Sequence, residues 1–543
     1  MVTGFGLKSP INDGNRKWWT LVAACFALFM AILDNLVVNV ALPTIARELE
    51  SSTTQLQWIV SAYILVFASL QITAGGLGDR FGRKRWFLGG IALFTTTSLA
   101  AAFAYNAETL IAARAIQGLG AAFILPLSLT LISAAFPPEE RGKALGIWSA
   151  VSVSGLALGP VIGGFLVDYM SWNWIFLVNV PVGIGAFMVA LAVVHESRDT
   201  SGTVATDIPG TLIVTGAIAT LTWALIEAGE RGWGDQLIVT SFAVSVALFG
   251  AFVWIEDRVA RPMVPLRFFR YRTFTGANVD AFVVSFLIAG VAFFTTLYLQ
   301  NVHGFSAVRA GLALLPMVAV MMIGSPISGV LINRIGSSKL IALGMAVTGA
   351  GTLLFLRAGI NASYLDITPA YMVMGLGFSL IFAPMTTAVL NSVESEKSGV
   401  ASAVNGAVRE VGNAFGIALL GTLMNRAYQA QFDSSPEIRA LRGDEAMAPL
   451  QPVVDLIGSG MGYGGRVVEN SLAFPGLDPA ITGIVREVSS EAFMGGMDRA
   501  ILVSALAIIA ASIASYVLIN DRVPQPVGEL DQVGVLVPAS GAD

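Results

Sequence analysis

Five charged residues interrupt apolar stretches that are long enough to cross a lipid bilayer: Asp34, Arg114, Asp280, Arg409 and Glu410. A charged side chain at the centre of a bilayer costs about 2.5–3.5 kcal/mol on the insertion scale, so such residues are usually functional. A carboxyl group in this position is suited to binding and releasing a proton. An arginine beside it favours the ionised form until protonation breaks the ion pair.

Asp34 and Arg114 are the first candidates for this proton chemistry. Asp34 lies about seven residues from the outer end of its predicted helix, roughly 10 Å deep at about 1.5 Å per residue. Arg114 lies about five residues from the outer end of its helix, roughly 7–8 Å deep. Similar depths allow the two to pair, with Asp34 as the proton carrier. The alternative is a buried ion pair that only fixes helix packing.

Arg409 and Glu410 lie near the middle of their stretch, and adjacent residues point about 100° apart on a helix, so they cannot both face one partner. Glu410 is either a second proton site, a charge that selects cationic ligands, or a residue that only neutralises Arg409 through a neighbouring helix. Asp280 lies about one turn inside its helix. It is expected either to attract cations into an open cavity or to be merely interfacial.

The composition is that of a membrane protein. Hydrophobic residues make up 55% of the 543-residue chain and charged residues 12%, whereas soluble domains carry about 25% charged residues. A net charge of −5 argues against nucleic-acid binding. One cysteine, Cys25, and two histidines argue against an intrachain disulfide and a metal site, and no cofactor is expected. Since no catalytic grouping is present, the protein is not expected to be an enzyme.

Fourteen apolar runs are long enough for membrane-spanning helices, which predicts an all-α membrane protein. The runs are Trp18–Ala41, Trp58–Gly78, Trp86–Tyr105, Thr109–Phe136, Lys143–Val167, Trp174–Val194, Ile208–Glu227, Gln236–Ile255, Gly276–Leu299, Ala310–Ile332, Lys339–Arg357, Pro369–Leu390, Gly399–Met424 and Ala500–Ile519. The short loops on one side hold 19 Lys and Arg, against 4 on the other side. By the positive-inside rule, both termini are expected in the cytoplasm, with the chain in the inner membrane.

A weak internal repeat divides the chain. Gly118-Leu119-Gly120 recurs as Gly375-Leu376-Gly377, 257 residues later, and residues 75–82 match 329–336 at an offset of 254. This offset spans eight helices. It predicts six-helix bundles at 18–194 and 274–520, two inserted helices in 195–273, and cytoplasmic tails at 1–17 and 521–543. Two such halves form transporters with a substrate site between them. An outer loop, 425–499, lies within the second bundle.

Five motifs in the chain resemble one family. Residues 75–85, Gly-Gly-Leu-Gly-Asp-Arg-Phe-Gly-Arg-Lys-Arg, resemble the loop signature of the major facilitator superfamily. Residues 33–43, 114–120, 155–164 and 172–181 resemble the helix 1, arginine, antiporter and helix 6 motifs of its 14-helix drug:proton antiporter branch. The resemblance implies a proton-coupled transporter of the multidrug efflux type, which exports amphipathic and in some cases cationic small molecules. It also implies that the helices of Asp34 and Arg114 are neighbours.

The resemblance also points to two groups of site residues. The gating motif comprises Gly75, Asp79, Arg80, Gly82, Arg83 and Lys84. Asp79 is expected to brace a helix N-terminus in the outward-facing state, or else to be a solvated loop carboxylate. The antiporter motif comprises Gly155, Gly159, Pro160, Gly163 and Gly164. Its small residues are expected to let backbones approach closely at the seam between the halves.

Three positions depart from the family pattern: Asn173 replaces an arginine, Glu410 replaces a glutamine, and Asn333 stands where the first repeat has Asp79. Only the first repeat can therefore use a carboxylate in this loop.

The expected lining of the substrate cavity comprises Met30, Tyr63, Phe67, Asp280 and Arg409. The outer loop is expected to cap the exit, to contact a partner in the cell envelope, or to be a tolerated insertion, with a short amphipathic helix at Ala480–Ala492. The rival functions are a dedicated exporter of one metabolite, lipid or siderophore, and a non-transporting membrane sensor or scaffold.

Overall fold

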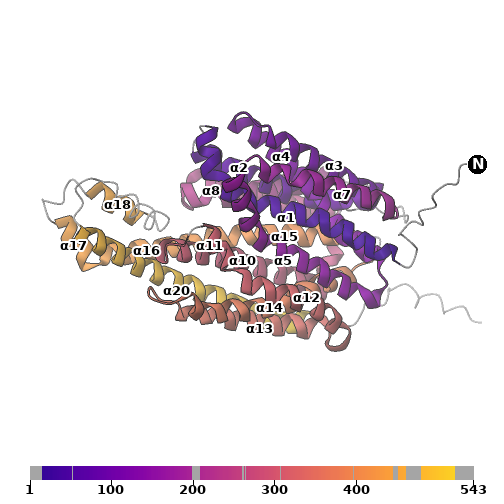
Figure 1. Ribbon diagram of the computed structural model, residues 1–543. Coiled ribbons are helices and arrows are strands. Elements are labelled where there is room, and N and C mark those ends of the chain that lie inside the picture. The colour runs from indigo at the N-terminus through magenta and orange to yellow at the C-terminus, as the bar shows by residue number, and fades with distance from the viewer. Residues whose placement is uncertain are drawn as a thin grey trace, which may run out of the picture.

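Long helices running side by side form the protein (Figure 1). The computed structural model describes residues 15–49, 51, 53–198, 208–259, 262, 264–305, 307–394, 397–443, 451–459 and 479–519, and these residues contain no strand. Residues 1–14 and the predicted tail at 521–543 lie outside the described part.

The N-terminal bundle covers the first six predicted runs. Its helices are α1 (Arg16–Glu48), α2 (Thr53–Phe81), α3 (Arg83–Ala102), α4 (Ala107–Ala135), α5 (Pro138–Tyr169), α6 (Trp174–Leu177) and α7 (Asn179–Val193). Local sequence sets several of these boundaries. Asn106 and Thr109 form a capping box at the start of α4. Gly82 has a φ of +115° and makes the tight turn between α2 and α3, a conformation that disfavours other residues.

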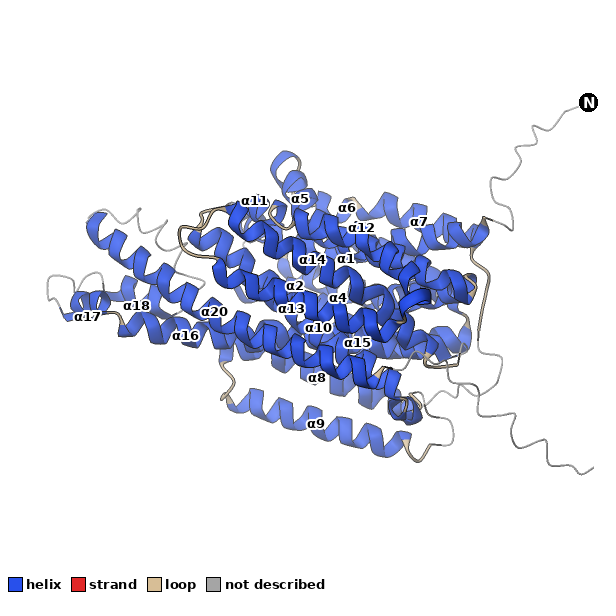
Figure 2. Cartoon of the chain, turned by 90° about the horizontal axis from the view of Figure 1, so that it is seen from below, coloured by secondary structure: helices blue, strands red, loops and turns tan. Residues whose placement is uncertain are grey.

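Two further helices, α8 (Ile208–Arg231) and α9 (Gln236–Glu256), follow the N-terminal bundle. α8 packs on α2 and α15, whereas α9 packs on α8 at the periphery (Figure 2). The hydroxyl groups of Thr73 and Thr215 lie 3.2 Å apart between α2 and α8. These contacts place α8 against helices of both halves and α9 on its outer side, and the assignment of the pair as an insertion stays a prediction.

The C-terminal bundle follows the same plan. Its elements are η1 (Leu266–Arg270), α10 (Arg272–Leu297), η2 (Tyr298–Val302), α11 (Ala307–Leu312), α12 (Leu315–Ile335), α13 (Ser337–Leu354), η3 (Phe355–Arg357), α14 (Tyr364–Asn391), α15 (Ser398–Phe415), η5 (Gly416–Leu420), α16 (Gly421–Ser434), α17 (Pro436–Gly443), α18 (Gln451–Ser459) and α20 (Pro479–Leu518). Gly336 has a φ of +91° between α12 and α13, at the position that Gly82 occupies in the first half.

The packing of the helices repeats between the halves. α2 and α3 pack on α4, as α12 and α13 pack on α14. Likewise α1 packs on α5 and α7, as α10 packs on α15 and α20. The two halves meet where α2 packs on α15 and where α5 packs on α12. The sequence repeat therefore corresponds to a structural repeat whose two copies face each other.

All fourteen predicted runs fall on helices, but eleven of the described helices are long and apolar enough to cross a membrane. The three runs outside this set lie on α3, α5 and the segment from α15 to α16. Three cations open α3, and Arg409 and Glu410 lie within α15, which makes these two helices less apolar. Fourteen spans therefore stay a prediction.

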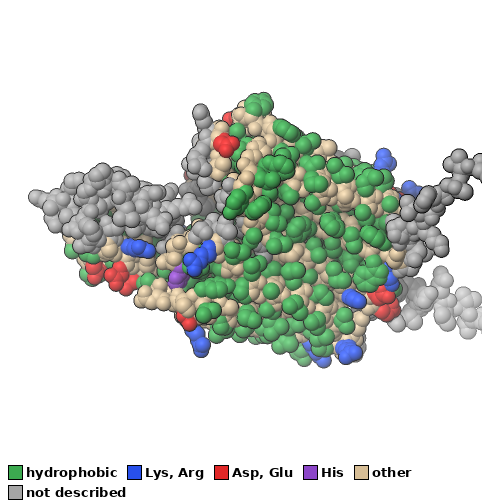
Figure 3. Space-filling view, in the orientation of Figure 1, with side chains coloured by type: hydrophobic (Ala, Val, Ile, Leu, Met, Phe, Trp, Pro, Cys, Tyr) green, Lys and Arg blue, Asp and Glu red, His purple; other side chains and the backbone are tan. Residues whose placement is uncertain are grey.

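Hydrophobic side chains cover the flank of the bundle, whereas charged side chains gather towards its two ends (Figure 3). Many large apolar residues among the described ones are exposed, including Phe165, Val246, Ile323 and Leu506. A surface of this kind suits the hydrocarbon core of a bilayer. The chain is a multi-pass membrane protein.

The predicted outer loop contains ordered helices. α20 is one helix of 40 residues, about 60 Å long and twice the hydrocarbon thickness of a bilayer. The expectation of a separate short helix at Ala480–Ala492 is wrong, because this segment continues into the predicted span. α17 and α18 lie beyond the end of the bundle (Figure 1). Arg442 holds them together through ion pairs with Asp433 and Asp455 at 2.9 and 3.0 Å.

Candidate functional site

Asp34 is fully buried inside the N-terminal bundle, among hydrogen-bond donors from two other helices. Arg114 Nη1 on α4 forms an ion pair with Asp34 Oδ2. Gln117 Nε2 on α4 and Asn179 Nδ2 on α7 donate to Asp34 Oδ1 at 2.9 and 2.7 Å. These three donors, one of them a cation, bind both carboxyl oxygens of Asp34 in this conformation.

Arg114 is buried to the same degree and depends on this carboxylate. Its Nη1 also donates to Gln117 Oε1 at 2.8 Å, and its Nε donates to Ile59 O at 3.3 Å. The guanidinium carbon lies 4.3 Å from the ring centroid of Tyr63, a cation–π geometry. Nη2 has no hydrogen-bond partner among the described residues. Neutralising Asp34 would therefore leave an uncompensated cation in the bundle core.

Two amide side chains in this cluster, Gln117 and Asn179, were not among the predicted site residues. A signal for Gln117 exists, because it lies three residues after Arg114 and thus on the same helix face. Asn179 carries no such signal beyond its place in the 172–181 motif. It also donates to Ser98 Oγ at 3.0 Å, which connects α7 to α3. Asp34 is therefore held by a network that involves five helices, α1, α2, α3, α4 and α7.

Glu410 and Arg409 lie on α15 in the C-terminal bundle and are partly buried. Glu410 accepts a hydrogen bond from the side chain of Asn413, one turn further along the helix. The guanidinium carbon of Arg409 lies 5.2 Å from the ring centroid of Phe382 on α14. Tyr63 of the N-terminal bundle is within electrostatic range of both Asp34 and Glu410. The two candidate carboxyl groups therefore lie in opposite halves, and both act electrostatically on Tyr63.

Asp79 lies near the C-terminus of α2 and is fully buried at the start of α15. Its Oδ1 accepts a hydrogen bond from Arg83 Nε at 2.8 Å, and its Oδ2 accepts one from the backbone N–H of Val400 at 2.9 Å. Arg83 Nη2 donates to Ser398 Oγ at 3.2 Å. A carboxylate at a helix N-terminus satisfies free N–H groups and is favoured by the helix dipole. This motif thus ties the two halves together.

The remaining residues of the gating motif have separate places. Lys84 Nζ donates to Leu191 O at 2.8 Å, at the end of α7. The guanidinium carbon of Arg80 lies 4.9 Å from the ring centroid of Phe81. A Cβ atom on Gly75 would lie 2.5 Å from Gly399 O, so the backbones of α2 and α15 nearly touch. Gly75 therefore lies at the seam between the halves, as Asp79 and Arg83 do.

The seam is closed along the end of the bundle that carries the predicted cytoplasmic loops. Ser402 Oγ donates to Pro126 O at 3.3 Å, between α15 and α4. Asn333 Nδ2 donates to Glu139 O at 3.0 Å, between the α12 end and the start of α5. A Cβ atom on Gly142 of α5 would overlap the backbone of Gly329 on α12. This conformation is therefore sealed at the Asp79 end.

The glycines of the antiporter motif pack inside the N-terminal bundle. A Cβ atom on Gly159 would lie 2.7 Å from Leu36 Cβ on α1, and one on Gly163 would lie 3.2 Å from Val37. Gly155 faces Ile32 of the same helix. The expectation that this stripe lines the seam between the halves is wrong. α5 meets the other half near its own start, where Gly142 and Gly146 lie against α12.

The predicted cavity residues do not form one lining. Met30 and Tyr63 belong to the apolar core of the N-terminal bundle, and the rings of Tyr63 and Phe67 stack at 5.8 Å. Asp280 is fully buried and faces Ser515 of α20. Asp280 therefore lines no open cavity in this conformation, and its attraction of cations stays a prediction. Arg409 is separate from both, on α15.

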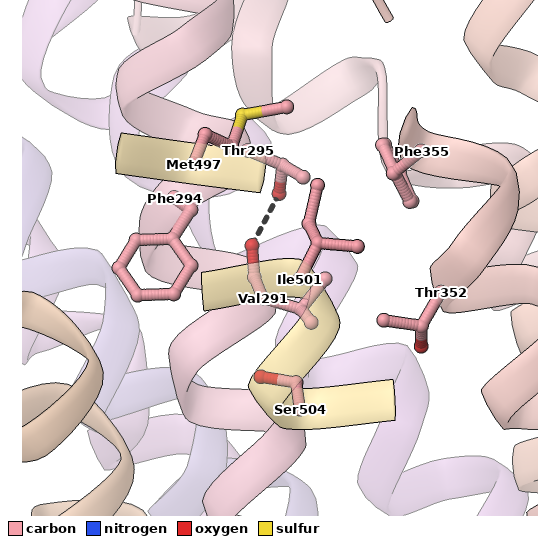
Figure 4. A pocket seen from close by; sticks show the side chains of 8 residues that line it. All are labelled: Val291, Phe294, Thr295, Thr352, Phe355, Met497, Ile501 and Ser504. Atoms are coloured by element: carbon pink, nitrogen blue, oxygen red, sulfur yellow. Dashed lines mark hydrogen bonds between the residues drawn. The ribbon is translucent and has the colours of Figure 1, made fainter. Parts of the chain in front are cut away.

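A small apolar cavity lies elsewhere, inside the C-terminal bundle between α10, α13 with η3, and α20 (Figure 4). It is lined by Val291, Phe294, Thr295, Thr352, Phe355, Met497, Ile501 and Ser504. Thr295 Oγ1 in this lining donates to Val291 O at 2.6 Å, so its polar atom is satisfied. The lining contains none of the predicted site residues, and we assign no role to it.

Comparisons with known proteins agree with the paired bundles. At 34% identity over 506 residues, the chain is similar to the tetracenomycin C resistance and export protein of Streptomyces glaucescens, covering 92% of this chain and 91% of that protein. It is 38% identical to the multidrug resistance protein Stp of Mycobacterium tuberculosis over 407 residues, 75% of each chain. The methylenomycin A resistance protein of Streptomyces coelicolor is 36% identical over 428 residues, 78% of this chain and 90% of that one.

Two solved structures share the fold. The human organic anion transporter MFSD10 matches with a TM-score of 0.56 at 13% identity, covering 74% of this chain and 93% of that chain. The proton:xylose symporter XylE matches with a TM-score of 0.56 at 14% identity, covering 76% of this chain and 89% of that chain. The family model described as Major Facilitator Superfamily matches residues 24–417 of the chain. The chain belongs to the Major Facilitator Superfamily.

Proposed function

We propose that this protein is a secondary transporter that exports amphipathic small molecules across the cytoplasmic membrane in exchange for protons. The names of three relatives, which refer to resistance or export, support the direction and the substrate class. The excess of Lys and Arg on one side supports cytoplasmic termini and the bundle boundaries 18–194 and 274–520. Fourteen membrane crossings are part of the same proposal.

The observation that carries this proposal is the buried network around Asp34. A carboxylate with an arginine and two amide donors is expected to release its proton when the network is intact and to break the network when it is protonated. Removing the charge of one partner of a buried ion pair costs about 3–5 kcal/mol. Moving a two-state equilibrium from 1:99 to 99:1 takes about 5.5 kcal/mol. Protonation of Asp34 alone therefore provides most of the free energy that such a conformational switch requires.

The cycle follows from the sealed seam. With the Asp79 end closed, Asp34 takes a proton from the outer side and its hold on Arg114 weakens. The bundles then rearrange, and the seam between α2 and α15 opens towards the cytoplasm. Binding of an amphipathic molecule there favours release of the proton into the cytoplasm and return of the ion pair. Closing the seam again carries the molecule outward.

Glu410 and Asp79 have different parts in this proposal. The carboxyl group of Glu410, in the half opposite Asp34 and partly buried, favours cationic molecules between the bundles. Asp79 stabilises the sealed conformation through its hydrogen bond to Val400 at the α15 N-terminus. Neither residue needs to touch the other for transport to be coupled, because both act on the position of α15.

The test uses purified protein in proteoliposomes that are loaded with a panel of amphipathic fluorescent compounds under an imposed pH gradient. We expect several cationic compounds to move against their gradient, with proton movement in the opposite direction, and both fluxes to stop when the pH gradient is dissipated. Movement of a single compound would favour the dedicated exporter. No flux of any compound, from protein that still unfolds cooperatively, would favour the sensor or scaffold.

A further inference from the structure

A second carboxyl group is buried in the C-terminal bundle without a cation. Asp280 on α10 is fully buried. Its Oδ1 lies 2.7 Å from Ser515 Oγ on α20, and its Oδ2 has no hydrogen-bond partner among the described residues. A lone ionised carboxylate in such a place is costly, and a group in this position normally becomes neutral instead. Asp280 thus differs from Asp34, which has an arginine and two amide donors.

The single hydrogen of the Ser515 hydroxyl group also indicates that Asp280 is protonated. Ser515 Oγ lies 2.7 Å from Asp280 Oδ1 and 2.8 Å from the backbone oxygen of Ala511. A hydroxyl group has one hydrogen to donate, whereas a carboxylate and a carbonyl can only accept. If Asp280 is protonated, its O–H donates to Ser515 Oγ, and Ser515 donates to Ala511. Both contacts are then satisfied, and Oδ2 is an uncharged carbonyl oxygen.

The surroundings of Asp280 provide no charge to stabilise the ionised form. α20 presents Ser515 to it, and α13 presents the thioether of Met345, which lies 3.3 Å from Ser515 Oγ. No titratable group among the described residues pairs with it. The cation Arg272 of the same helix is eight residues away, about 12 Å along the axis, and donates to Val517 O.

The position of Asp280 connects it to the moving parts of the bundle. Two residues before it on α10, Asn278 accepts a hydrogen bond from Asn405 on α15 at 3.2 Å. The N-terminus of α15 is the element that Asp79 holds in the sealed conformation. A displacement of α15 therefore acts on α10 close to Asp280, on the side of the bundle where cytoplasmic water would enter.

We propose that Asp280 is a second proton-binding site, protonated in the sealed conformation and deprotonated to cytoplasmic water when the seam opens. This inference rests on the proposed function, because it assigns one further proton to the same cycle. In each cycle the Asp280 O–H bond breaks and the proton goes to cytoplasmic water while the seam is open, and the carboxylate takes a new proton from the outer side once the seam has closed. Asp34 and Asp280 then titrate in opposite halves of one transporter.

The first test does not need transport. Infrared difference spectra at neutral pH between wild type and Asp280→Asn are expected to contain the carbonyl stretch of a protonated carboxyl group, which Asp257→Asn, an exposed control, leaves in place. Ser515→Ala keeps Asp280 and is expected to shift this band to higher frequency, because a hydrogen bond is lost. This variant also serves if Asp280→Asn fails to fold. Absence of the band at Asp280, or no shift in Ser515→Ala, would overturn the proposal.

The second test counts protons. The number of protons exchanged per molecule exported, measured from the gradient at which net flux reverses, is expected to fall by one in Asp280→Asn and to stay unchanged in Asp257→Asn. An unchanged number in Asp280→Asn would show a neutral structural acid and overturn the proposal. If wild type moves no protons, the proposed function fails and this inference fails with it, even where the infrared band is present. If wild type is coupled and only Asp280→Asn behaves like wild type, the inference alone fails.

Discussion

Replacing Asp79 by asparagine is expected to open the sealed seam. The amide keeps the shape of the side chain and one neutral hydrogen bond to the N–H of Val400, but it loses the charge at the α15 N-terminus. Hydrogen bonds to charged groups contribute about 1.5–3 kcal/mol, against about 1 kcal/mol for neutral ones. The helix terminus adds about 0.3–1 kcal/mol. The change from a charged to a neutral hydrogen bond, about 0.5–2 kcal/mol, and the helix-terminus contribution together should destabilise the sealed conformation by roughly 0.8–3 kcal/mol.

A loss of this size has a measurable effect on the population of the open conformation. At about 1.36 kcal/mol per factor of ten, the open population should increase about 4- to 150-fold. Only the contacts across the seam count, since the ion pair between Asp79 and Arg83 lies on one side of it.

Thiol labelling can report this change directly. The single cysteine, Cys25, is replaced by alanine, and a new cysteine is placed at Ser402, which is buried in the seam. Asp79→Asn is expected to speed the reaction of this cysteine with a water-soluble reagent by about the same factor, while Asp257→Asn leaves it unchanged. A labelling rate equal to that of the parent would refute the assigned role of Asp79 in the seal.

Three further substitutions separately test the packing inside one bundle, the seam between the halves and the outer helices. Gly159→Leu places a side chain against Leu36 inside one bundle, and should lower stability by roughly 1–3 kcal/mol in thermal unfolding without raising proton leak. Gly142→Ala overlaps the backbone of Gly329 across the seam, and should increase Ser402→Cys labelling with little change in the stability of each bundle. Arg442→Ala removes the ion pairs between the outer helices, and should speed limited proteolysis there while export stays within about twofold of wild type. A proton leak in Gly159→Leu, unchanged Ser402→Cys labelling in Gly142→Ala, or proteolysis of Arg442→Ala at the wild-type rate would contradict these assignments.

Apolar periodicity was sufficient to predict the helical fold, because each long apolar run must be helical in a bilayer. Glycines that recur at one offset predicted two related halves, and the helices of the two halves pack in the same pattern. The boundary of α20 was not predictable in this way. Its polar first half and apolar second half look like two segments, yet the helix continues through Gly495 and Gly496, because each glycine costs only about 1 kcal/mol and no proline follows Pro479 in it.

The site was predictable where charges are involved and less so elsewhere. Asp34 and Arg114 stand out because a charged side chain in a membrane helix is costly and is therefore usually functional. Gln117 and Asn179 are neutral amides, which carry a much smaller penalty and therefore a weaker signal. The orientation of Asp280 depends on how α10 is rotated against α20, and an all-round apolar helix contains no information on that rotation.

The charge of Asp34 is the centre of the account, and Asp34→Asn tests it most directly. In proteoliposomes, this variant should still exchange labelled for unlabelled substrate across the membrane, because the amide permits a neutral, alternating transporter. It should fail to move substrate against a gradient when a pH gradient is imposed, and substrate should no longer drive proton movement. Uphill export by Asp34→Asn at the wild-type rate, with protons still moving, would contradict the account.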